Sequence, residues 1–149
     1  MTRIVYLPLV MAALVLPASA QDAARGFPMD RSYKAVSISG FDVQKMALTL
    51  AVTRNPKGDG LRGSGNAGCN SWNATAILRD SQIDFTNIVT TRKLCAKPRM
   101  TAEEAFLTSL RSARRWQVDG DKLIIEGDAA RLMLKAGSPE KPSAKSKKK

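Results

Sequence analysis

Hydrophobic and polar residues alternate along most of the chain, and this pattern predicts β-strands. In residues 46–52 every second position is apolar, as expected for a strand that buries one face. Residues 72–78 show the same period, and residues 33–39 show it less regularly. Further strands are predicted at residues 61–64, at 83–85 continuing to 88–91, and at 116–118, 122–125 and 130–135. The chain is therefore predicted to contain about eight short strands.

Turn-forming residues separate these strands. Residues 55–60, Asn-Pro-Lys-Gly-Asp-Gly, are dense in turn chemistry. Asp119-Gly120 lies between two apolar segments and is a strong signal for a two-residue hairpin loop. Neighbouring strands joined by such short loops pair antiparallel, so an antiparallel sheet is expected.

One segment, from Thr101 to about residue 114, has a helical pattern. Thr101 and Glu104 have the spacing of a capping box, in which each side chain bonds a free backbone amide of the first turn. Glu103 and Glu104 also suit the positive end of the helix dipole. The apolar stripe consists of Phe106, Leu107, Leu110 and Ala113. With this helix between the sixth and seventh strands, the predicted fold class is α+β.

The first twenty residues have the layout of a secretory signal. They contain Arg3, an apolar run over residues 4–16, and the sequence Ala18-Ser19-Ala20. We expect cleavage after Ala20 and hence a periplasmic or secreted protein. A retained membrane anchor is the alternative, but a spanning helix needs about 20 apolar residues and the run is shorter. No cysteine lies near the cleavage point, which argues against a lipid-anchored precursor.

The chain is strongly basic, with 24 Lys and Arg against 13 Asp and Glu and a formal net charge of +11. Residues 137–149 hold many of the lysines and no large apolar side chain, so burial cannot offset the entropy of ordering them. We predict a disordered basic tail there and a flexible segment at residues 21–31. The folded domain is predicted to span residues 32–136.

Cys69 and Cys95 are the only two cysteines. In an oxidising compartment an even number predicts one disulfide. The alternative is a redox-active thiol pair, but catalytic dithiols usually have the spacing Cys-x-x-Cys. The chain contains no histidine, which removes the usual general base, the commonest neutral metal ligand and the Ser-His-Asp hydrolases. We therefore predict no catalytic residues, no metal and no cofactor.

Three other patterns are better explained by structure than by chemistry. Residues 58–63 match Gly-x-Gly-x-x-Gly, but the residues that follow cannot sustain the helix that a dinucleotide site requires. Asp80 and Asp84 could form a carboxylate pair or a calcium site, but solvated residues flanking a turn are the favoured interpretation. Trp72 and Trp116 could form a ligand-stacking platform, yet packing in the core is favoured.

The order and spacing of several motifs over residues 32–136 resemble the META domain (HslJ-like) family. The motifs are an aromatic-led first strand, a Gly-Cys-Asn turn, a Thr-Arg run ending in cysteine, and a helix with paired glutamates. The first-strand aromatic is Tyr33, where tryptophan is usual. The matching motif residues are Gly68, Cys69, Asn70, Thr91, Arg92, Cys95, Glu103 and Glu104.

The resemblance implies a curled antiparallel sheet or cracked β-barrel with the helix packed across it. It implies no catalytic activity, because the family has no established enzymatic site. It also implies a link to heat shock, envelope stress and drug tolerance, and therefore an interaction module of the bacterial envelope. A structurally similar barrel binds lipid, so a small lipid or other apolar ligand held inside the barrel is an alternative.

Basic residues suggest a second alternative, the binding of polyanions. The partner would be an unknown envelope component, an anionic membrane surface or lipopolysaccharide; nucleic acid is disfavoured because export removes the protein from it. Near the helix, the candidates are Arg92, Lys93, Lys97, Arg99, Arg111, Arg114 and Arg115. In the tail, they are Lys145, Lys147, Lys148 and Lys149.

Overall fold

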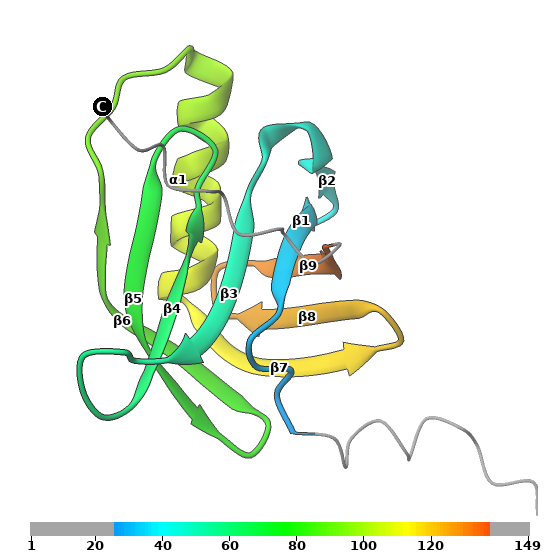
Figure 1. Cartoon of the computed structure of the whole chain (residues 1–149). Coiled ribbons are helices and arrows are strands. Elements are labelled where there is room, and N and C mark those ends of the chain that lie inside the picture. Colours follow the sequence, from blue (N-terminus) through cyan, green and yellow to red (C-terminus); the bar gives the residue numbers. More distant parts are fainter. Residues whose placement is uncertain (1–25, 138–149) are drawn as a thin grey trace, which may run out of the picture.

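Antiparallel strands close into a barrel that one helix crosses, as the computed structural model of residues 26–137 shows (Figure 1). The strands are β1 (Ser32–Ile38), β2 (Phe41–Asp42), β3 (Thr49–Arg54), β4 (Leu61–Asn66), β5 (Ser71–Arg79), β6 (Gln82–Thr90), β7 (Ala113–Asp119), β8 (Lys122–Gly127) and β9 (Arg131–Ala136). The helix α1 spans Lys97–Arg111, and a short 3-10 helix, η2, spans Gln44–Met46.

The order of strands in the sheet is β2-β1-β3-β4-β5-β6-β7-β8-β9, and β1 also pairs with β9. This second pairing of β1 closes eight strands, β1 and β3 to β9, into a ring. The two-residue β2 pairs with β1 outside the ring. The α+β class, the barrel and the position of the helix between β6 and β7 confirm the predicted fold.

The alternating pattern places apolar residues inside the barrel. Leu48, Leu50 and Val52 are fully buried, which confirms most of the predicted buried face of residues 46–52. Met46 is only half-buried and belongs to η2, so the strand starts later than predicted, at Thr49. A two-residue hairpin joins β7 and β8 as predicted, but its loop is Gly120-Asp121, because Asp119 is still in β7 and pairs with Lys122. Gly120 has a φ of +60°, which favours glycine. Residues 58–63 form the end of a turn and the start of β4, so the glycine-rich motif precedes a strand rather than a helix.

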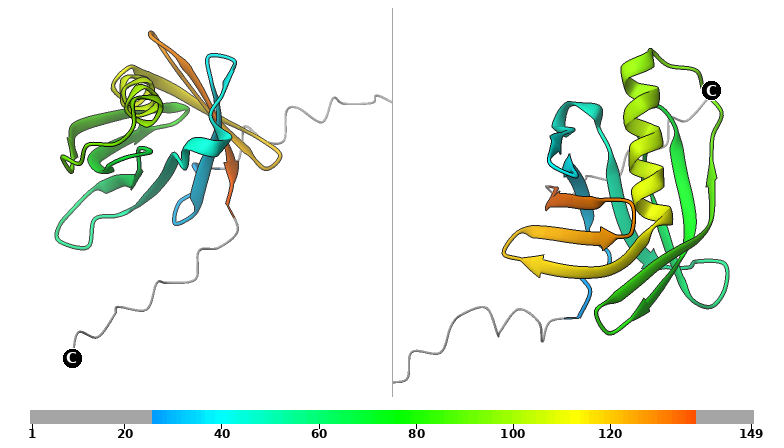
Figure 2. Two further views of the ribbon diagram at one scale, coloured as in Figure 1. Left: turned by 90° about the horizontal axis from the view of Figure 1, so that it is seen from above. Right: turned by 180° about the vertical axis from the view of Figure 1, so that it is seen from behind.

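Among neighbouring strands of the ring, β6 and β7 have the fewest paired residues. These strands share one registered pair, Gln82 with Arg115, and one nearby hydrogen bond from Trp116 N to Ser81 O at 2.9 Å. We call this join the seam of the barrel. The helix α1 packs against β6 on one side of the seam and against β8, β9 and β1 on the other (Figure 2). The barrel is therefore cracked, and the helix covers the crack.

Large side chains fill the interior. Trp72 is 1% exposed and makes edge-to-face contacts with Phe85 and Phe106, with ring centroids 5.9 and 6.0 Å apart. A Cβ added at Gly63 would lie 2.8 Å from the Phe85 ring, which shows how closely β4 packs on these aromatics. An internal ligand would have to displace these rings, so the structure gives no support to the lipid-binding alternative.

Both tryptophans are packing elements, as predicted. Trp116 is half-buried, and its ring stacks edge-on against Phe27 with centroids 5.1 Å apart. Its Nε1–H donates to the Asp80 carbonyl oxygen at 3.0 Å. Asp30 N also donates to Val52 O at 2.9 Å. Packing of the domain therefore begins at Phe27 rather than at residue 32, and only residues 21–25 of the predicted flexible segment lie outside the described residues.

The predicted start of the helix is wrong. Helix α1 begins at Lys97, has Pro98 in its first turn and has no side-chain cap at Ala96. Thr101 lies inside the helix, where its hydroxyl donates to the Lys97 carbonyl oxygen at 3.1 Å, so it forms no capping box with Glu104. Proline is favoured at the first helical positions because it has no N–H to leave unpaired. No helix within residues 26–137 is long and apolar enough to cross a membrane.

Candidate functional site

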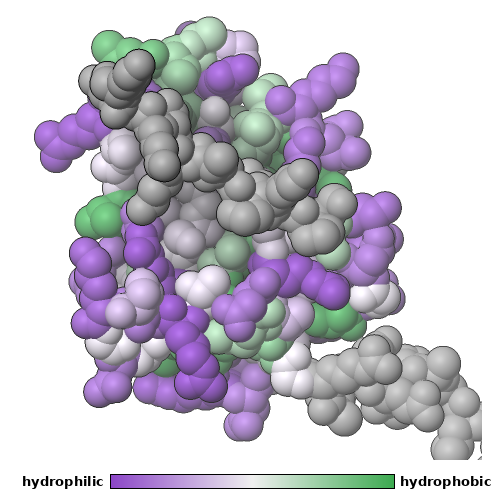
Figure 3. Space-filling model, viewed as in Figure 1, coloured by the Kyte–Doolittle hydropathy of each residue, from purple (hydrophilic) through white to green (hydrophobic). Residues whose placement is uncertain are grey.

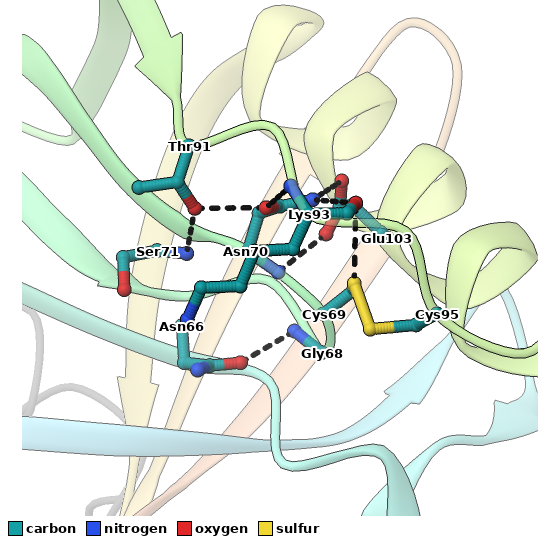
Figure 4. The surroundings of a disulfide bond; sticks show 9 residues. All are labelled: Asn66, Gly68, Cys69, Asn70, Ser71, Thr91, Lys93, Cys95 and Glu103. Carbon is teal, nitrogen blue, oxygen red and sulfur yellow. Dashed lines mark hydrogen bonds between the residues drawn. A yellow bond between two sulfur atoms is a disulfide. The ribbon is translucent and has the colours of Figure 1, made fainter.

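The predicted disulfide is present and joins two segments that are far apart in the sequence. Cys69 lies in the turn between β4 and β5, and Cys95 lies in the loop between β6 and α1 (Figure 4). Their Cα atoms are 5.9 Å apart, within the usual range for a disulfide. The bond therefore fixes the loop that enters the helix against the β4–β5 turn.

Asn70, next to Cys69, is the centre of a buried hydrogen-bond network. Its side-chain Oδ1 accepts from Lys93 N at 2.7 Å and from Thr91 Oγ1 at 2.8 Å, and its Nδ2 contacts Lys93 O at 3.3 Å. Thr91 Oγ1 in turn accepts from Ser71 N at 3.2 Å. One side chain, only 2% exposed, thus holds the backbone of the loop on both sides of Lys93.

Glu103 completes the network from the helix. Its carboxylate accepts from Asn70 N at 2.8 Å and from Asn70 Nδ2 at 2.9 Å, and the residue is 7% exposed. A buried carboxylate is costly unless it is hydrogen-bonded, and here both oxygens are. We refer to Cys69, Cys95, Asn70, Thr91 and Glu103 together as the disulfide corner.

The prediction that Glu103 complements the helix dipole is wrong, because α1 has no acidic residue in its first turn. The helical period offered a better signal. Glu103 lies three, four and seven residues before Phe106, Leu107 and Leu110, so it shares their buried face. A glutamate on that face requires a partner inside the domain, and Asn70 is that partner.

The turn itself requires a glycine. Gly68 has a φ of +101°, and a Cβ added there would lie 3.2 Å from Leu48 Cδ2. Gly68 N donates to Asn66 Oδ1 at 2.6 Å, and Ala67 N donates to the Asn70 carbonyl oxygen at 2.7 Å. The Gly-Cys-Asn sequence is thus explained residue by residue: a left-handed turn, a disulfide and a network centre.

Most of the family-motif residues meet in this corner, but two do not. Gly68, Cys69, Asn70, Thr91, Cys95 and Glu103 lie together, whereas the side chains of Arg92 and Glu104 are exposed. Within residues 26–137, every buried side-chain nitrogen or oxygen has a hydrogen-bond partner. The polar groups of the corner therefore bond to one another, and their effect is to fix the backbone of residues 91–95.

The predicted basic patch is divided into two groups. Arg92, Lys93, Lys97 and Arg99 are exposed where the chain enters α1, and Arg111 lies at the opposite end of the helix. A rise of about 1.5 Å per residue separates Arg99 from Arg111 by about 18 Å along the axis. The four tail lysines lie outside the described residues.

Arg114 and Arg115 lie in β7, beyond the helix. Arg114 forms ion pairs with Asp84 at 3.5 Å and Asp128 at 3.1 Å. With Gln82, Glu126 and Gly127 these residues line an open pocket of about 440 Å³ near the seam. Since the acidic side chains there neutralise Arg114, the pocket is not a simple anion site. Asp84 is therefore an ion-pair partner on β6, while Asp80 lies in the β5–β6 turn.

The fold and the disulfide corner define a class of small protein: a cracked antiparallel barrel covered by one helix and pinned by one disulfide. Residues 28–139 match the META domain, and the chain belongs to that family. No match was found among curated proteins.

Solved structures show the same fold. One is the NMR structure of a protein from Burkholderia xenovorans, with 21% identity, a TM-score of 0.62, and coverage of 91% of this chain and 99% of that one. A second NMR structure has 18% identity and a TM-score of 0.54, and covers 70% of this chain and 87% of that one. At these identities the similarity concerns the fold alone.

Proposed function

We propose that this protein is an exported, non-catalytic interaction module that acts in the bacterial envelope during stress. The observation that carries the proposal is the use made of the family motif. Asn70 and Glu103 bond to each other, Asn70 also bonds to Lys93, and the disulfide joins Cys69 to Cys95. Together these bonds fix a surface loop in place. Residues arranged in this way favour presentation of a binding surface over the activation of a nucleophile.

Two further observations support the proposal. The sequence contains no histidine, so the commonest general base is missing from the whole chain. Both cysteines are joined in the disulfide, which suits an oxidising compartment outside the cytoplasm. The expected signal at residues 1–20 agrees with this location, although those residues lie outside the described part of the chain.

Site-specific crosslinking in living cells tests the proposal. A photo-crosslinking amino acid at Arg92, which is exposed beside the disulfide corner, is expected to capture an envelope component. The matched control places the same group at Lys122, an exposed residue at the start of β8. A second control lacks residues 139–149 and removes the lysine-rich sequence.

Two results would count against the proposal. One is an unprocessed protein that remains in the cytoplasm, which mass analysis of the amino terminus would detect. The other is saturable turnover of a substrate that a single substitution in the Arg114 pocket abolishes, because that result would make the protein an enzyme. Greater sensitivity to envelope stress in a deletion strain, restored by the intact gene, is the expected phenotype.

A further inference from the structure

The segment from Thr91 to Arg99 consists of the loop before α1 and the first three residues of the helix, and we call it the cationic loop. It carries an unusual combination of exposed groups. Leu94 is 95% exposed, more than any other large hydrophobic residue among those that the structure describes. Arg92, Lys93 and Lys97 are also exposed, as is Arg99 in the first turn of α1. Hydrophobic surface lies next to hydrophilic surface at this upper end of the molecule (Figure 3).

The exposure of Leu94 is imposed by the neighbouring residues. On one side, Lys93 is held through both its N–H and its carbonyl oxygen by Asn70. On the other side, Cys95 is bonded to Cys69. A single exposed leucine is ordinary on a protein surface. Here the residues on both sides of Leu94 are fixed, and the side chain is held outward. Little further conformational entropy is lost when the leucine enters an apolar environment, which favours binding.

Along the chain, the nearest charged residues on both sides of Leu94 are all basic. Between Asp84 and Glu103 the sequence contains four basic residues and no acidic one. Asp84 pairs with Arg114 at the other end of the helix, and Glu103 is turned inward onto Asn70. The exposed Glu104 lies seven residues into the helix from Lys97, about 10 Å along the axis.

From this arrangement we propose that the cationic loop binds the surface of an anionic phospholipid bilayer, with Leu94 entering the boundary between headgroups and acyl chains. An apolar side chain surrounded by Lys and Arg fits that boundary, where hydrocarbon lies beside negative charge. An acidic protein surface would satisfy the cations but offers no general place for a leucine at the tip. This inference rests on the proposed interaction role and names its partner.

Vesicle co-sedimentation tests the inference. The probes are vesicles of phosphatidylcholine with and without phosphatidylglycerol, and the protein is purified as the cell processes it. Leu94→Ala is expected to weaken binding to the anionic vesicles about tenfold through lost apolar burial. Lys93→Gln is expected to weaken it about fivefold, since each basic residue contributes about 1 kcal/mol near such a surface. Binding to phosphatidylcholine alone is expected to be weak.

Matched controls separate the loop from general effects. Phe41→Ala removes another exposed hydrophobic residue, 77% exposed, from β2 outside the ring, and Lys122→Gln removes a lysine of β8. A variant without residues 139–149 removes the tail. When Leu94→Ala is added to any of these control variants, it is still expected to weaken binding to the anionic vesicles. All the substituted side chains are exposed, so circular dichroism and unfolding midpoints should match those of the parent.

Several outcomes overturn the inference. These are absence of binding to anionic vesicles, equal losses for Leu94→Ala and Phe41→Ala, or binding that disappears with the tail alone. A protein captured by crosslinking at Arg92, combined with no vesicle binding, would support the proposed function and reject the lipid surface. If vesicle binding depends on Leu94 and crosslinking in cells captures no protein, the two results together support the lipid surface.

Discussion

Replacement of Glu103 by glutamine tests the buried network most directly. The two carboxylate oxygens accept from Asn70 N at 2.8 Å and from Asn70 Nδ2 at 2.9 Å. Glutamine keeps one oxygen and turns an NH₂ group toward a second donor, so one hydrogen bond is lost and the donors face each other. Nothing else in the side chain changes in shape, which makes the substitution specific for hydrogen bonding.

The expected cost follows from these two bonds. A hydrogen bond to a charged group contributes about 1.5–3 kcal/mol, and an unsatisfied buried donor costs about 1–3 kcal/mol. Burying a neutral amide rather than a carboxylate recovers part of this loss. We expect the free energy of unfolding to fall by about 2 kcal/mol. Glu104→Gln, at the exposed neighbour, is expected to change it by less than about 0.5 kcal/mol.

Urea denaturation followed by tryptophan fluorescence measures both variants, since Trp72 is buried in the core. A second substitution provides a rescue. Asn70→Asp alone sets two carboxylates against each other, but in the Glu103→Gln background the new carboxylate accepts from the glutamine amide. We expect a favourable coupling of at least about 1 kcal/mol. The reasoning fails if Glu103→Gln costs no more than Glu104→Gln, or if the double variant is merely additive.

Three other outcomes are expected. Replacing Cys69 and Cys95 together by alanine opens a loop with a sequence separation of 26, which on the chain-entropy estimate lowers the free energy of unfolding by about 3.5 kcal/mol; calorimetry should show a Tm lower by roughly 15 °C. Gly65→Ala should leave little folded protein in circular dichroism, because its Cβ would collide with the Thr49 carbonyl oxygen. Gly58→Ala, in an open turn, should be nearly neutral in the same measurement, and a loss there would show that the glycine argument is too simple.

Local pattern was sufficient to predict the strands but not the way they close. The alternation around Leu48, Leu50 and Val52 and the hairpin at Gly120 depend on neighbouring residues, so the sequence contains them directly. The pairing of β1 with β9 joins opposite ends of the domain, for example Tyr33 with Ala136, and no local period encodes such a contact. The barrel was therefore expected from the family resemblance alone.

The helix shows why the site was predicted only in part. Thr101 and Glu104 imitate a helix start, but the true start is fixed by tertiary contacts, since Cys95 is tied down two residues before Lys97. Moving the start changes the role of Glu103 from an exposed dipole partner to a buried one. The disulfide was predictable because it needs only two cysteines and an oxidising compartment, whereas the partner of Asn70 depends on how the helix is turned.

The seam between β6 and β7 determines where the barrel opens locally. One registered pair and one adjacent backbone hydrogen bond close the ring there, so local opening breaks few backbone hydrogen bonds. The helix α1 contacts strands on both sides of the seam and holds them together. Amide hydrogen exchange should accordingly be fastest among strand residues beside Gln82 and Arg115, and slowest in the long β4–β5 ladder. The disulfide lies at the far end of β6, so it steadies the helix entry without locking this joint.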